Sequence, residues 1–132
     1  MSPQEEKDLR SYIVERARSE VGVKEDAGSN LDSNGRIAMY WSSINDSRVD
    51  PKIVGPGAAY CAAFVSWVYE YSGLILEHEH GSGISYVPWM VDFFKEQQLF
   101  FTNPKKAKEG DIIFYQGKRP NHVGIIEYAG YR

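Results

Sequence analysis

Hydrophobic residues recur at helical spacing through the first two thirds of the chain. An N-terminal helix is predicted to start at Ser2 and to end at Gly22, because Ser2, Pro3 and Glu5 together form the capping signature of a helix start. Apolar positions spaced three and four residues apart indicate more helices after it. They are predicted at residues 37–44, at residues 60–71 and after a cap at Ser85.

Near the end of the chain the spacing of apolar residues changes from that of a helix to that of a strand. Residues 112–115 and 122–128 read as two short apolar strands separated by a turn-rich link, and runs this close should pair as an antiparallel hairpin. The polar segments 28–35, 45–58 and 77–83 are predicted loops. Because helices come first and the sheet last, we expect one α+β domain that spans residues 1–132.

Composition limits the classes of partner. The 132 residues are 42% hydrophobic and 25% charged, which is typical of a folded domain with its own core. The net charge of −3 provides no positive field for nucleic acid. No apolar run approaches the ~20 residues of a membrane span, and the N-terminus lacks the apolar core of a signal peptide. We therefore expect no nucleic acid and no membrane span, in a chain made in the cytoplasm as written or excised from a longer protein.

The single cysteine, Cys61, lies where a loop rich in glycine and proline meets the helix predicted at 60–71. The first turn of a helix has unpaired N–H groups and a partial positive charge. A thiol held there loses its proton more easily and can act as a nucleophile. The alternative is that Cys61 is a small buried hydrophobic residue.

His122 opens the last predicted strand and is the candidate partner of Cys61. Strand alternation places His122 and Gly124 on one face, where the glycine leaves space beside the imidazole. We expect this face to contact the helix of Cys61, while Val123 and Ile125 point the other way. Asp111, just before the neighbouring strand, is a candidate to hydrogen-bond the ring, or else serves the geometry of the turn.

Several motifs in register resemble the CHAP-domain peptidoglycan hydrolases of the NlpC-like, papain-fold superfamily. The resemblance covers nearly the whole chain. The motifs are Val21–Glu25, Asn34–Ile37, Tyr60–Trp67, Glu109–Phe114 and Asn121–Ile126. The resemblance implies a papain-like α+β fold in which N-terminal helices pack on a small C-terminal antiparallel sheet.

The same resemblance implies a mechanism and a substrate. Cys61 would be the nucleophile and His122 the general base, with the N–H of Cys61 helping to hold the oxyanion. Tyr60 would line the cleft or serve only in packing. The substrate would be an amide bond of peptidoglycan, either the link between N-acetylmuramic acid and L-Ala or a bond within the peptides. No cofactor or metal is needed, and the site of action would be the cell wall or the cell exterior.

The sequence departs from this family pattern at the third catalytic residue, which members carry on the strand after the histidine. The chain ends ten residues past His122, which leaves little room for that strand. Three interpretations stay open. The residue lies past Arg132 in a longer protein, or Asp111 or a loop group replaces it, or the domain is a non-catalytic wall-binding or structural unit.

A further alternative is a metal-binding protein. His78 and His80 alternate as ligands on a strand would, and Cys61 could complete such a site. A solvated loop is the favoured interpretation of this segment, because a Gly-Ser-Gly run follows it.

Overall fold

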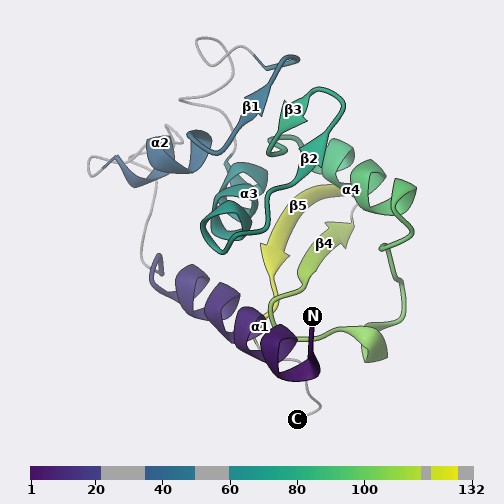
Figure 1. Cartoon of the computed structure of the whole chain (residues 1–132). Helices are drawn as coiled ribbons and strands as arrows, with labels where there is room; N and C mark the ends of the chain where they lie inside the picture. The colour runs from purple at the N-terminus through teal and green to yellow at the C-terminus, as the bar shows by residue number, and fades with distance from the viewer. Residues whose placement is uncertain (22–34, 50–59, 117–119, 128–132) are drawn as a thin grey trace.

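The computed structural model describes residues 1–21, 35–49, 60–116 and 120–127. Most of the predicted loop at 28–35 and the second part of the loop at 45–58 lie outside the described residues. Within them, helices and two small antiparallel sheets make up the structure (Figure 1). The α+β class expected from the sequence is confirmed.

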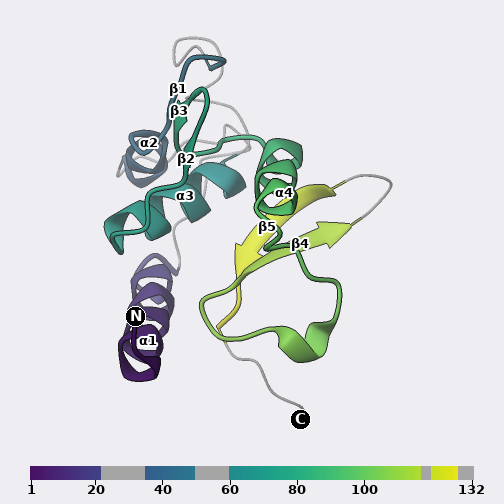
Figure 2. The same ribbon diagram turned by 45° about the vertical axis from the view of Figure 1, so that its right-hand side comes forward.

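Helix α3 (Cys61–Tyr71) is the centre of the structure, as Figures 1 and 2 show. Its apolar residues are buried on two sides, and the helix therefore contributes residues to two hydrophobic clusters. Ala62 and Val65 belong to the first cluster, whereas Trp67 and Val68 belong to the second. The helix was predicted at residues 60–71, and that prediction is confirmed.

The second cluster joins α3 to α1 (Pro3–Arg18) and α2 (Arg36–Trp41). The predicted capping box of α1 is present: the Ser2 hydroxyl accepts a hydrogen bond from the Glu5 backbone N–H at 3.1 Å, and the Glu5 carboxylate accepts one from the Ser2 N–H at 3.2 Å. The α1 helix ends at Arg18, a turn earlier than the predicted end at Gly22.

The first cluster joins α3 to α4 (Val87–Glu96) and to the hairpin of β4 (Ile112–Gln116) and β5 (Pro120–Ile125). The antiparallel hairpin was predicted and is confirmed, with Phe114 paired to Val123. The predicted cap of α4 is wrong by one residue. Tyr86, not Ser85, occupies the N-cap, and it makes no side-chain capping bond.

A small three-stranded sheet lies where the sequence predicted loops. Its order is β1 (Asn45–Asp46), β3 (Gly81–Ser82), β2 (Glu77–His78). Gly81 permits the close pairing, because a Cβ there would lie 1.8 Å from the Asn45 carbonyl oxygen and its φ is +137°. The loop prediction was wrong since strands of two residues are too short to show an alternating pattern.

Candidate active site

Cys61 is the first residue of α3, as the sequence predicted. Its thiol is free and half-buried, and it packs against the first hydrophobic cluster. Tyr60 precedes it at the N-cap and makes no side-chain capping bond. The backbone N–H groups of this first turn are therefore not used by the N-cap side chain, and a helix leaves them without intrahelical acceptors. Unpaired N–H groups at this place can hold a developing oxyanion.

Two hydrogen-bonding anchors fix the helix that carries Cys61. The buried Ser66 hydroxyl donates to the Ile84 carbonyl and accepts from the Ile84 N–H, both at 2.9 Å. Farther along α3, the Tyr69 hydroxyl donates to the Gly110 carbonyl at 2.5 Å. Burial, with the Asp111 carboxylate nearby, raises the pKa of Tyr69 far above its ordinary value, so the phenol stays a donor. Sequence reasoning missed Ser66, although a serine on an apolar helix face is a signal of such a bond.

The structure places His122 on β5 opposite Tyr115 of β4, with ring centroids 5.3 Å apart. Both side chains are exposed. The neighbouring Val123 is only 2% exposed and belongs to the cluster that Cys61 packs against. Because side chains alternate along a strand, His122 points away from that cluster.

This corrects the expectation that His122 faces the helix of Cys61 while Val123 and Ile125 point elsewhere. The physical reason is hydrophobic burial, since both apolar side chains pack inward against the clusters built on α3. The described structure therefore brings strand β5 beside the cysteine helix, but it turns the imidazole to the other face of the hairpin.

Asp111 lies away from His122 at the other end of the hairpin. The Arg10 guanidinium donates to its carboxylate at 2.6 Å, and the Lys108 N–H donates at 2.9 Å. Burial lowers the pKa of Arg10, but the hydrogen bond to Asp111 and the nearby negative charges, that of Asp111 first, together outweigh burial, so the pKa lies above its ordinary value and the guanidinium stays protonated. The expectation that Asp111 orients the imidazole is not met here, since Tyr115 is the residue opposite His122. Asp111 instead ties α1 to the start of β4.

Tyr60 is half-buried beside the second cluster, with its ring centroid 6.3 Å from that of Tyr40. Tyr60 therefore has the packing role that was one of the two alternatives considered for it. Its place directly before Cys61 also keeps it at the entrance of the helix, where a contact with substrate stays a prediction.

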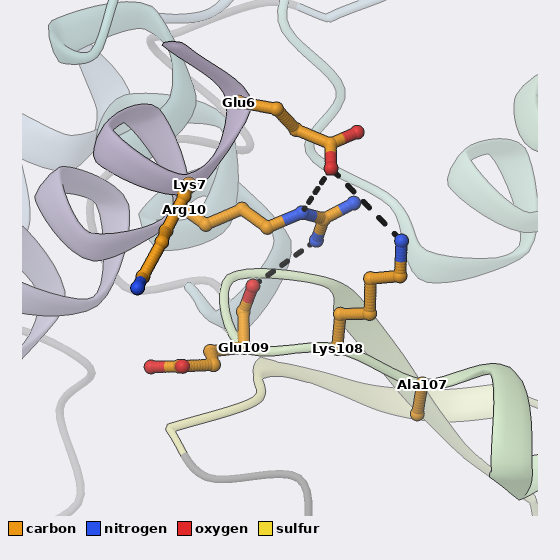
Figure 3. A pocket seen from close by; sticks show the side chains of 6 residues that line it. All are labelled: Glu6, Lys7, Arg10, Ala107, Lys108 and Glu109. Atoms are coloured by element: carbon orange, nitrogen blue, oxygen red, sulfur yellow. Dashed lines mark hydrogen bonds and ion pairs between the residues drawn. The ribbon is translucent and has the colours of Figure 1, made fainter. Parts of the chain in front are cut away.

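Two cavities open near the N-terminal half of β4. The smaller, of about 300 Å³, lies between α1 and the segment before β4 (Figure 3). Figure 3 shows Arg10 and Lys108 converging on the Glu6 carboxylate, at 3.7 and 3.9 Å. The larger has a volume of about 880 Å³. Neither of these two cavities is lined by Cys61 or His122.

The two histidines considered as metal ligands lie in the small sheet and its turn. His78 is half-buried; its Nε2 lies 2.8 Å from the Gly83 carbonyl, and its Nδ1 accepts from the His80 N–H at 3.2 Å. Both ring nitrogens therefore serve local structure. Among the residues that the structure describes, no three His, Cys, Asp or Glu side chains gather as metal ligands would. No helix in those same ranges is long and apolar enough to cross a membrane.

Comparison with known proteins identifies the family to which the chain belongs. Residues 54–130, more than half of the chain, match the NlpC/P60 family. The chain therefore belongs to the NlpC/P60 family, whose members are generally cysteine peptidases of the peptidoglycan-hydrolase type. The matched segment contains both Cys61 and His122. Neither a search of curated proteins nor a search of solved structures found a match.

Proposed function

We propose that this domain hydrolyses amide bonds of bacterial peptidoglycan at the cell wall, with Cys61 as nucleophile and His122 as general base in a papain-like arrangement. The observation that carries the proposal is the place of Cys61, half-buried at the first residue of a rigidly anchored helix. The family match over residues 54–130 supports it. The CHAP type within that superfamily stays a prediction.

The chemistry follows from the two side chains. His122 takes the thiol proton, and the Cys61 sulfur bonds to the amide carbonyl carbon while first-turn N–H groups hold the oxyanion. The C–N bond then breaks, and the imidazolium gives its proton to the leaving amine. His122 next takes a proton from water, whose oxygen attacks the thioester and releases the carboxylate and the thiol. No cofactor takes part in these steps.

Catalysis requires His122 to reach the face on which Cys61 lies. The pairing of β4 and β5 is irregular between Tyr115 and Gln116, next to His122. A bulge disrupts the pairing only locally and can re-aim a side chain. We place the required rearrangement there, N-terminal to Val123, so that the buried cluster stays intact.

A second function is favoured by one observation. The exposed pair of Tyr115 and His122 rings, turned away from Cys61, suits a non-catalytic domain that binds the wall or serves as a scaffold. In that account Cys61 is inert and His122 has no influence on the thiol.

The pH profile of Cys61 alkylation by iodoacetamide tests which account holds. If His122 withdraws the thiol proton, the His122→Ala variant alkylates Cys61 only at higher pH than the unmodified domain. The control variant His80→Ala, which removes another partly exposed ring, leaves the profile unchanged. Identical profiles for the unmodified domain and His122→Ala would favour the non-catalytic account.

Activity distinguishes the two candidate bonds. Cleavage between N-acetylmuramic acid and L-Ala creates free lactyl carboxylates on the glycan, whereas cleavage within the peptides leaves the lactyl amide intact. Mass spectrometry of the released fragments identifies which product forms.

A further inference from the structure

The cavity of about 880 Å³ lies apart from the proposed chemistry, between the end of α4, the short helix η1 (Pro104–Lys106) and strand β4. In Figure 2 the segment that follows α4 arches outward through η1 before it returns to β4. All residues that line the cavity belong to the described ranges. Its volume falls within the ~300–1,000 Å³ that is typical of small-molecule sites.

Apolar side chains form both the floor and the rim of this cavity. Phe94 and Phe114 line it from the first hydrophobic cluster, with ring centroids 6.3 Å apart. At the rim, Leu99 is 55% exposed, Phe101 is 60% exposed and Ile113 is 36% exposed. Three large apolar side chains left in water around one hollow indicate an apolar ligand, because isolated exposed residues are common but a contiguous group is not.

The charge of the lining is opposite to that of the chain. Arg10, Lys106 and Lys108 line the cavity together with a single carboxylate, that of Asp111, whereas the whole chain carries −3. Arg10 is bound to Asp111, and Lys108 lies 3.9 Å from Glu6. Among the described residues, no carboxylate forms an ion pair with Lys106, whose ammonium lies 5.3 Å from the Phe101 ring centroid. Lys106 is thus the cation at the rim that can accept an anion.

We propose that this cavity binds an amphiphilic anion, a single acyl chain that ends in a carboxylate or phosphate. The chain lies against Phe94, Phe114 and Leu99, and the anionic head lies beside Lys106. This binding site is independent of Cys61 and His122, neither of which lines it.

Isothermal titration calorimetry with monomeric sodium dodecanoate tests the proposal on the unmodified domain. We expect saturable binding of one molecule. Leu99→Asn should weaken it about tenfold, because a partly exposed leucine that becomes covered contributes about 1.4 kcal/mol. Lys106→Gln should weaken it about threefold, as for one exposed ion pair.

Two matched variants serve as controls. Ile75→Asn removes an apolar side chain that is 53% exposed but outside the cavity, and Lys105→Gln removes the neighbouring lysine, which does not line it. Both should bind dodecanoate like the unmodified domain. Equal losses in the control and cavity variants, or no saturable binding, would overturn the proposal. Binding only to phosphatidylglycerol vesicles would also overturn it, since it would assign the exposed residues to membrane contact instead.

Discussion

The replacement Ser66→Ala tests how firmly the cysteine helix is anchored. The Ser66 side chain, on a residue only 2% exposed, makes two hydrogen bonds with one residue, to the N–H and to the carbonyl of Ile84. Alanine leaves both of these backbone groups without that partner in the interior. An unsatisfied buried polar group costs about 1–3 kcal/mol, so with two such groups the variant should lose about 2–6 kcal/mol of unfolding free energy. That is a large part of the ~5–15 kcal/mol that holds a typical domain.

Urea unfolding followed by tryptophan fluorescence measures this loss. The control is Ser42→Ala, in which an exposed hydroxyl at the end of α2 gives up a bond to the Met39 carbonyl. Water replaces that partner, so the control should change stability by less than about 0.5 kcal/mol. If Ser66→Ala costs no more than the control, the described contact between α3 and Ile84 does not carry the stability assigned to it.

The remaining predictions concern two carboxylates. Burial raises the pKa of Asp46, but hydrogen bonds from the Arg48 side chain and N–H, together with the electrostatic effect of Arg48 and His78, outweigh burial and hold the pKa below its ordinary value. Asp46→Asn should therefore cost about 2 kcal/mol at pH 7. The difference should shrink as pH falls below about 4, where the unfolded chain binds the proton first, and should vanish once pH passes the lowered pKa of the folded state. Urea unfolding at pH 7 and at acid pH checks this, and a pH-independent difference would contradict it. Asp111→Asn should lower the melting temperature through the lost bond to Arg10, yet leave the Cys61 alkylation profile unchanged; a changed profile would mean that Asp111 does orient His122.

Much of the fold could be predicted from the spacing of apolar residues along the predicted helices. The capping box at Ser2 and the apolar faces of α1 and α3 are local signals, and the structure contains them as predicted. The hairpin was predictable for the same reason, because two apolar runs separated by a short link have few other ways to pair. The two-residue strands, in contrast, depend on contacts between segments far apart in the chain, as in the pairing of Asn45 with Ser82.

For the candidate site too, local signals in the sequence were sufficient for some features and not for others. The sequence pattern was enough to place Cys61 at a helix start, since glycine and proline residues precede an apolar run with helical spacing. The side of the hairpin to which His122 points could not be predicted in this way, because alternation fixes which residues share a face but not which face is buried. Val123 and Ile125 contained the missing signal, since apolar residues on one face compete for the core. The role of Asp111 depended on Arg10, about a hundred residues earlier, and no local pattern indicates such a partner.

We propose that Cys61 and His122 together cleave peptidoglycan. The most direct test of this proposal is the release of soluble fragments from purified peptidoglycan by the unmodified domain, by Cys61→Ala and by His122→Ala, with circular dichroism to show that all three are folded. The proposed mechanism predicts release by the unmodified domain and none above background by either variant. Equal release by the unmodified domain and Cys61→Ala, or no release by any of the three folded proteins, would contradict it.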